Sequence, residues 1–468
     1  MKTEDSHFDE IFQSVARKGK SRQGFIYRSF RAYLRFVHER FFYRNVYRVG
    51  KENIPPDGVP VLIVSNHQNC LNDPLGVLFT FKDRKLNILT RADVFAVHPA
   101  ISFLLRKMGL LPAYRLNFEG EDALGKNKEI FYVLEKELIS GRTILMYPEG
   151  MHQDKHWLGD FSLSYARMAF EAAERDDFQT EIFILPCCNH YSEYYDIQKD
   201  VLIKFGTPVS IKPYYELYRT RPRTAQRQVN AVIREQIIGM MLHATDLDNY
   251  EAIDFLRNTY GRKYAEDHGF KVACLPDKLQ SDQIFLKKLE EAKVENASSI
   301  QQIFDDALKL EDELKRLKIR DDNFVNTSGR SAIIMSVIVI VVLFPVWLFS
   351  LWPNLFIYKA PVLVMRRVKD KMFHNSFLFG ISVLITMPAL YTLSFILAWV
   401  YANGWFAFIY APALPWLGLF AWYYWKYAVR TWQNAHFCRV SATTAGRKVR
   451  DLRNSVYERL NNILNKYE

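Results

Sequence analysis

Residues 59–79, with the sequence VPVLIVSNHQNCLNDPLGVLF, decide the fold and carry the chain's most reactive side chains. Residues 61–64 form a short β-branched run, which predicts a strand buried on both faces. Asp73 precedes Pro74, and an acidic N-cap followed by proline is a helix-start signal, so we expect a helix to begin there. His67 therefore lies in the turn between strand and helix, six positions before a carboxylate.

This pairing of an imidazole with a carboxylate has two interpretations. A histidine hydrogen-bonded to a carboxylate has its tautomer fixed and its protonated form stabilised, which suits it to take a proton from an alcohol. The simpler interpretation is that Asp73 only caps its helix, while His67 is a polar residue at a strand end. The stretch alone does not decide between them, and the motifs downstream favour the functional interpretation.

Length, charge and cysteine content bound the class of protein. The chain has 468 residues, too many for one ordinary core, so we expect two or more regions. A net charge of +11 suits an anionic membrane or nucleic acid as partner, and long apolar runs near the C-terminus favour the membrane over nucleic acid. Five cysteines without paired or metal-ligand spacing indicate reduced thiols and no metal site. Residues 1–24 are polar, so we expect a leader without a cleavable signal peptide.

Residues 25–58 are predicted to form a basic amphipathic helix on the membrane surface. Arginine recurs there at spacings of three, four and five among aromatic residues, which places most arginines near one side of a helix. The alternative is an ordinary amphipathic helix packed on the domain. We favour the membrane interpretation because the segment lacks the lysine–glutamate pairing of a merely solvated face. The arginines are Arg28, Arg31, Arg35, Arg40, Arg44 and Arg48.

Residues 59–212 alternate short apolar runs with helical patterns, which predicts an α/β domain with a mostly parallel sheet. Functional groups in such a domain are expected at strand ends. Arg115 follows one apolar piece, and its guanidinium is suited to hold a phosphate. Glu149 and Gly150 follow another strand, where a carboxylate stands beside a glycine that lets a ligand approach the backbone. A further strand is expected to end at Pro186.

The order of these motifs resembles the PlsC-type glycerolipid acyltransferases over residues 59–212. Their four sequence blocks correspond to Asn66-His67 with Asp73, Gly109-Leu110-Leu111-Pro112-Ala113-Tyr114-Arg115, Tyr147-Pro148-Glu149-Gly150 and Ile184-Leu185-Pro186. The resemblance implies that His67 takes the acceptor's hydroxyl proton and that Asp73 orients His67. It further implies substrate binding by Asn66, Arg115, Glu149, Gly150 and Pro186, with no metal or bound cofactor.

Two departures from the common family pattern point to one branch. Five residues separate His67 from Asp73 where the family usually has four. The fungal-type glycerol-3-phosphate and dihydroxyacetone-phosphate acyltransferases and their bacterial relatives also have the longer gap, so the resemblance is greatest to that branch. Residues 151–154, MHQD, stand where the commoner enzymes have Thr-Arg-Ser, so phosphate binding is expected to rest more on Arg115.

The C-terminal half is predicted to form a helical arm followed by membrane segments. Residues 213–330 have helical apolar spacing, and residues 331–425 contain apolar runs at about 332–365, 377–401 and 405–425, long enough for membrane helices. Basic clusters flank these runs, and keeping all of them cytoplasmic requires the first run to enter and leave on one side, broken at Pro345 or Pro353. Residues 426–468 read as a basic amphipathic helix.

The resemblance and the apolar runs together imply a membrane-bound enzyme whose α/β domain faces the cytosol. It would move a fatty acyl group from acyl-CoA or acyl carrier protein to a hydroxyl of glycerol 3-phosphate or 1-acylglycerol 3-phosphate, in phospholipid biosynthesis. Two alternatives stay open: an acyltransferase for another lysolipid, such as a lyso-aminolipid, and a catalytically silent membrane protein that binds lipid. The presence of all of His67, Asp73, Arg115 and Glu149 favours an enzyme.

Overall fold

The computed structural model of the protein describes residues 24–81, 84–96, 99–114, 122–150, 154–325, 329–368 and 370–467. The chain forms two compact units. The first contains Met1–Met241 together with the short segment Asp370–Ser376, and the second contains Leu242–Lys369 and Phe377–Glu468.

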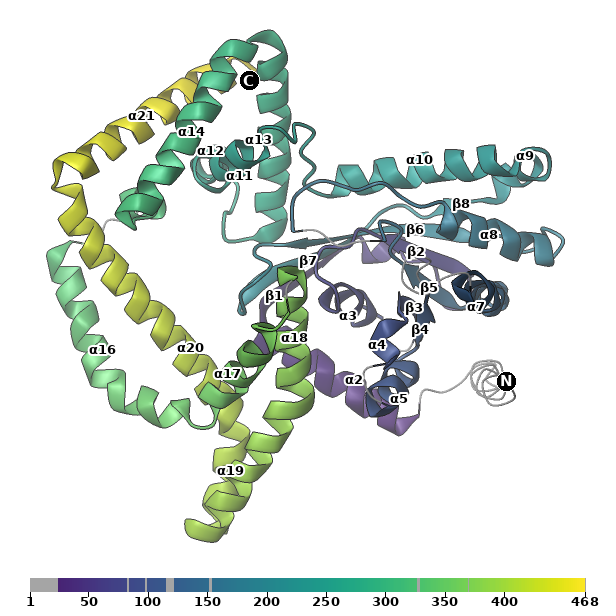
Figure 1. The fold of residues 1–468 in the computed structure, drawn as a ribbon, viewed down its shortest axis with the longest axis horizontal. Helices are drawn as coiled ribbons and strands as arrows, with labels where there is room; N and C mark the ends of the chain where they lie inside the picture. Colours follow the sequence, from purple (N-terminus) through teal and green to yellow (C-terminus); the bar gives the residue numbers. More distant parts are fainter. Residues whose placement is uncertain are drawn as a thin grey trace. The chain divides into compact units, whose positions relative to one another are not determined.

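The first unit is built on an eight-stranded, mostly parallel sheet (Figure 1). Only β6 runs antiparallel to β7 and β8, and the remaining pairings are parallel. The predicted α/β fold is therefore confirmed. The strand order is β1 (Tyr43–Val49), β7 (Lys199–Phe205), β6 (Phe183–Tyr191), β2 (Val61–Ser65), β5 (Thr143–Met146), β3 (Leu86–Arg91) and β4 (Leu110–Ala113), with β8 (Val209–Ser210) beside β6.

Strand β2 lies inside the sheet, between β5 and β6, and every one of its residues is buried. Leu62 and Val64 belong to the main core, which they share with helices on one face of the sheet. Helix α3 (Asn72–Leu78), which follows β2, lies on the opposite face (Figure 1). The helices of the main core are α7 (Asp122–Ile139), α8 (Ser164–Arg175) and α10 (Pro222–Met240). Burial on both faces explains why this strand is a continuous apolar run.

The helix predicted over residues 25–58 is wrong beyond residue 42. Helix α2 spans Phe25–Val37, a π-helical turn η1 follows at His38–Phe42, and the chain then enters the sheet as β1, parallel to β7. Several of the six arginines bond within the first unit: Arg31 donates to the Leu78 carbonyl, Arg44 pairs with Asp200, and Arg48 pairs with Glu39. A membrane contact by helix α2 stays a prediction. Pairing with a strand distant in sequence has overridden the helical spacing.

The first unit also extends further than residue 212. Helix α10 contributes Val229, Ile233 and Ile237 to the main core, so it packs on the sheet domain and is no part of a separate arm. The helical arm expected over 213–330 therefore begins only after Met241. It contains the short helices α11 (Tyr250–Asn258) and α12 (Tyr260–Asp267), followed by the longer α13 (Leu275–Glu295) and α14 (Ala297–Leu317).

Among the described residues, three helical stretches are long and apolar enough to cross a membrane: Arg330–Leu351, Lys371–Tyr401 and Gly404–Ser441. The first is α16, which ends before Pro353 and is followed by the shorter α17 (Asn354–Met365), so the break falls at one of the two prolines that the sequence indicated. The third, α20, continues beyond residue 425 to Ser441, and α21 (Thr444–Leu464) follows. The single helix expected over 426–468 is thus divided. The middle stretch comprises η4 (Lys371–Phe373), α18 (His374–Ile381), η5 (Ser382–Thr386) and α19 (Met387–Tyr401).

Candidate active site

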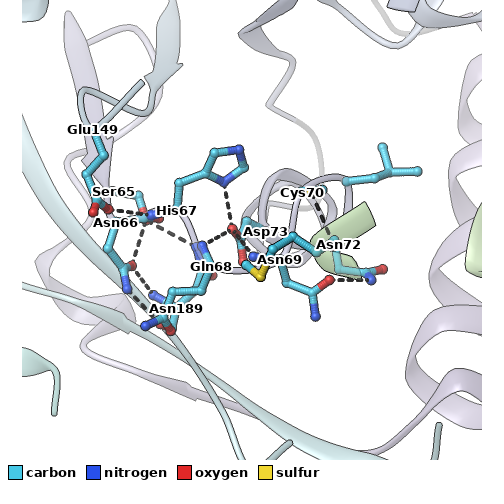
Figure 2. Close-up of polar contacts among 12 residues, drawn as sticks. Ser65, Asn66, His67, Gln68, Asn69, Cys70, Asn72, Asp73, Glu149 and Asn189 are labelled. Carbon is cyan, nitrogen blue, oxygen red and sulfur yellow. Dashed lines mark hydrogen bonds and ion pairs between the residues drawn. The ribbon is translucent and has the colours of Figure 1, made fainter. Parts of the chain in front are cut away.

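The loop between β2 and α3 brings His67 and Asp73 together. The Nδ1 atom of His67 lies 2.7 Å from Oδ2 of Asp73 (Figure 2). Asp73 is fully buried, whereas 19% of the His67 side chain is exposed. The second ring nitrogen, Nε2, lies on the side of the ring away from Asp73 (Figure 2). This is the geometry of a histidine whose tautomer is fixed by a carboxylate.

Asp73 does not cap its helix as the sequence predicted. Helix α3 begins one residue earlier, at Asn72, and the carboxylate of Asp73 turns back toward the preceding loop. Its Oδ2 atom accepts hydrogen bonds from the backbone amides of Gln68, at 2.7 Å, and Asn69, at 2.8 Å. The carboxylate therefore organises the loop that carries His67, because it binds the histidine ring and the two residues after it at once.

A tyrosine that sequence reasoning missed completes the environment of Asp73. The hydroxyl of Tyr191 donates to Oδ1 of Asp73 at 2.6 Å. Burial, together with the nearby Asp73 carboxylate, raises the pKa of Tyr191 well above its usual range, so the phenol keeps its proton and remains a donor. Four donors thus converge on one buried carboxyl group, which leaves it little freedom to rotate.

The ring of Tyr147 stacks on a face of the His67 imidazole. The two rings stack with centroids 4.3 Å apart and planes inclined by 26°. Burial raises the pKa of Tyr147 well above its usual range, so this ring stays neutral. The flat ring of Tyr147 thus limits the orientations open to the imidazole.

Glu149 supports the backbone of His67. Its Oε1 atom accepts from the His67 amide at 2.8 Å, and its Oε2 atom accepts from the Gly159 amide at 3.0 Å. Burial raises the pKa of Glu149. The sequence assigned Glu149 to the substrate pocket, but both of its oxygens are occupied by main-chain donors. Gly150 follows with φ of 65°, in the left-handed region that favours glycine, so it provides the turn after this carboxylate.

Asn66 and Pro186 form hydrogen bonds inside the sheet domain, and their predicted substrate binding stays a prediction. The buried amide of Asn66 bonds twice to the main chain of Asn189: Nδ2 donates to the carbonyl at 3.0 Å, and Oδ1 accepts from the amide at 2.8 Å. Pro186 is buried within β6, and its carbonyl accepts from the Gly206 amide at 2.8 Å. Arg115 lies outside the described residues, so its predicted phosphate contact stays a prediction.

Strand β6 does not end at Pro186 as the sequence predicted. It continues to Tyr191, and Pro186 lies between the residues paired with β8 and those paired with β7. A proline is tolerated at such a change of partner, because the regular ladder is interrupted there. Because the strand was predicted to end at Pro186, Asn189 and Tyr191 were not considered as site residues. A sequence signal for them exists: a polar run follows the apolar part of β6, and alternate residues of a strand lie on the same face.

Comparison with known proteins identifies an acyltransferase domain that includes this loop. Residues 45–190, less than a third of the chain, match the family model for acyltransferases, and the match includes His67, Asp73 and Glu149. An uncharacterized acyltransferase of Schizosaccharomyces pombe is 25% identical over 133 residues. That alignment covers 28% of this chain and 20% of the relative, so the chain spans about a fifth of the relative's length.

A crystal structure of the 1-acyl-sn-glycerophosphate (LPA) acyltransferase PlsC from Thermotoga maritima is also similar, with 15% identity and a TM-score of 0.34. The superposition covers 50% of this chain and 88% of that one. On the family match, the first unit contains an acyltransferase domain, and the loop with His67 and Asp73 lies within it.

Proposed function

We propose that this protein is a membrane-bound acyltransferase that moves a fatty acyl group from a thioester, acyl-CoA or acyl carrier protein, to a hydroxyl of glycerol 3-phosphate or 1-acylglycerol 3-phosphate. The observation that carries the proposal is the 2.7 Å contact between His67 Nδ1 and Asp73 Oδ2 within the matched domain. An alcohol is a poor nucleophile at neutral pH, and a positioned base corrects this.

The proposed reaction uses His67 twice. Nε2 takes the proton of the acceptor hydroxyl while its oxygen attacks the thioester carbonyl, and Asp73 stabilises the resulting imidazolium. The tetrahedral intermediate collapses, the carbon–sulfur bond breaks, and the imidazolium returns its proton to the leaving thiolate. The products are an ester and a free thiol, and the histidine is neutral again. The proposal requires no metal and no bound cofactor.

The contacts between the protein and its substrates are also part of the proposal. Arg115 is assigned to the acceptor phosphate on the sequence resemblance, because a guanidinium binds phosphate with two parallel hydrogen bonds. Replacing Arg115 with alanine should then raise the apparent KM for a phosphorylated acceptor and leave the KM for the acyl donor unchanged. An unchanged acceptor KM in an active variant would remove Arg115 from the site.

The membrane segments support a location at the bilayer, where an acyl donor and a lipid product both partition. Asp370–Ser376 belongs to the first unit, and no described helix between residues 242 and 329 is long and apolar enough to cross a membrane. Both ends of the α16–α17 stretch are therefore proposed to lie on the side of the acyltransferase domain. A 12-residue helix such as α17 extends only about 18 Å, against about 30 Å of hydrocarbon, which favours a re-entrant element over two full crossings. That side is proposed to be the cytosol, where the acyl donors are found.

The decisive experiment is an acyl-transfer assay on purified full-length protein. Radiolabelled palmitoyl groups are offered on CoA and on acyl carrier protein, with glycerol 3-phosphate, 1-acylglycerol 3-phosphate and a panel of other lysolipids as acceptors. His67→Ala is the matched control. Labelled product with either phosphorylated glycerol supports the proposal. Product formed only with another lysolipid reassigns the acceptor, and lipid binding without any product indicates the catalytically silent alternative.

A further inference from the structure

The loop between His67 and Asp73 contains an unusual backbone conformation. Cys70 has φ of 35°, a positive value that non-glycine residues adopt rarely. Such a conformation persists only where the surroundings hold it, and it is often found near functional sites. The backbone turns at Cys70 one residue after the Asn69 amide that binds Asp73. Whatever holds this turn also holds the amides that bind Asp73.

The contacts that hold the turn come from a segment about 300 residues later in the chain. We call residues 370–376 the strap. The Leu71 amide donates to Oγ of Ser376 at 2.9 Å, and the same Oγ donates to the Asn69 carbonyl at 3.4 Å. The thiol of Cys70 lies 3.5 Å from the carbonyl oxygen of Met372. Three consecutive loop residues thus contact the strap.

The strap has an ordered conformation of its own. The side chain of Asp370 accepts from the Met372 amide at 2.9 Å and so caps the short helical turn η4. Ser376 is buried, with 7% of its surface exposed. A second attachment is formed by Tyr195, just after β6, whose hydroxyl lies 3.4 Å from the sulfur of Met372. The strap therefore presents the Ser376 hydroxyl to the loop from a fixed position.

We propose that the strap is part of the acyltransferase site and that Ser376 is a positioning residue for proton transfer by His67. The inference rests on the proposed function. Ser376 binds the loop at Asn69 and Leu71, on either side of Cys70, and so keeps the Gln68 and Asn69 amides directed at Asp73. Asp73 in turn holds the ring of His67. The strap lies at the start of the apolar stretch Lys371–Tyr401, outside the residues that match the family model. The proposed reaction therefore depends on residues beyond the matched domain.

The test compares Ser376→Ala and Ser376→Thr in full-length protein kept in detergent micelles. Threonine retains the hydroxyl, so it should restore what alanine removes. The matched control is Ser382→Ala, which removes a buried serine hydroxyl bonded to the Ile357 carbonyl and touches neither the loop nor the strap. Two quantities are measured: deuterium exchange of the peptide that covers residues 66–73, and the steady-state constants for acyl transfer.

Ser376→Ala should speed exchange at the Leu71 amide at least about 10-fold, since that amide loses its acceptor. It should lower kcat by about 10- to 100-fold with both KM values unchanged, because a mispositioned base affects the transition state and not substrate binding. Ser376→Thr and Ser382→Ala should resemble the wild type.

Two results would overturn the inference: unchanged loop exchange in Ser376→Ala, or faster exchange with unchanged kcat. If the wild-type protein transfers no acyl group to any acceptor, the proposed function fails on its own. The strap is then judged by exchange alone, where a faster Leu71 amide supports the anchoring role and an unchanged one refutes it.

Discussion

Replacing Asp73 with asparagine should separate the chemical role of this residue from its structural role. Two backbone amides, of Gln68 and Asn69, donate into the Oδ2 position, so the asparagine oxygen must face the loop. That orientation also keeps an acceptor for His67 Nδ1 and preserves the tautomer. The new amide group then faces Tyr191, whose hydroxyl can turn to accept. Each partner of residue 73 keeps a hydrogen bond to it, with the direction reversed only at Tyr191, and what disappears is the negative charge.

The magnitudes follow from this arrangement. Unit charges about 4 Å apart at an effective dielectric constant of about 20 attract by about 4 kcal/mol, and losing that stabilisation of the imidazolium lowers the rate by about 10³. Stability should fall by only about 1–2 kcal/mol, as charge-assisted hydrogen bonds become neutral ones. Asp73→Ala is the contrasting variant. It leaves two amides and the Tyr191 hydroxyl without their acceptor, at about 1–3 kcal/mol each, so it should destabilise the protein severely.

Acyl-transfer rates and urea unfolding of the purified variants measure both effects. The reasoning is refuted if Asp73→Asn transfers acyl groups at near wild-type rate, because the charge would then have no part in catalysis. It is also refuted if Asp73→Asn is as unstable as Asp73→Ala, because the hydrogen bonds would not have been retained.

Three further outcomes are expected. Glu149→Gln offers one acceptor to two amide donors, so it should cost about 1–3 kcal/mol of stability and lower kcat with the acceptor KM unchanged; a raised KM would instead return Glu149 to the substrate pocket. Burial lowers the pKa of His38 to about 3, so the unfolded chain binds the extra proton between about pH 3 and 6.5, and stability falls with acidification across that window. Urea unfolding at pH 7 and pH 5 should show the wild type losing about 2 kcal/mol more than His38→Phe, and equal losses would exclude His38 as the cause. Single cysteines are placed at Arg367 and Asn403 in a protein without its native cysteines, and intact cells are treated with an impermeant maleimide. Only Asn403 should be labelled, since keeping the basic residues cytoplasmic places the turn before α20 on the far side of the membrane. Labelling at Arg367 would indicate three separate spans.

Local sequence was sufficient to predict that His67 and Asp73 lie close together. A buried β-branched strand, a short loop and a proline-marked helix start are adjacent in the chain, so the proximity of His67 and Asp73 follows from a few residues of geometry. The hydrogen-bonding role of the Asp73 carboxylate could not be predicted from local sequence. Both a helix cap and a loop acceptor require an aspartate at the same place, and only the positions of the Gln68 and Asn69 amides distinguish them.

Features that depend on distant partners could not be predicted. Tyr191 reaches Asp73 from 118 positions away, and Ser376 reaches Leu71 from 305 positions away. No local pattern encodes such contacts. Residues 43–49 were assigned to a helix because their arginine spacing fits one, whereas their true conformation is set by β7, more than 150 positions later. Contacts of this kind become visible only once the sheet order is known.

The position of β1 at one end of the sheet has a practical consequence for dissecting the protein. A fragment starting at residue 59, where the alternating pattern of the sequence begins, would lack β1 and expose the edge of β7. Its unpaired N–H and C=O groups would be a template for pairing with other copies. The buried Asp200 would also lose Arg44 and Asn45, its partners from β1. Such a fragment is expected to precipitate, whereas one that keeps residues 25–49 retains an edge strand whose arginines discourage aggregation.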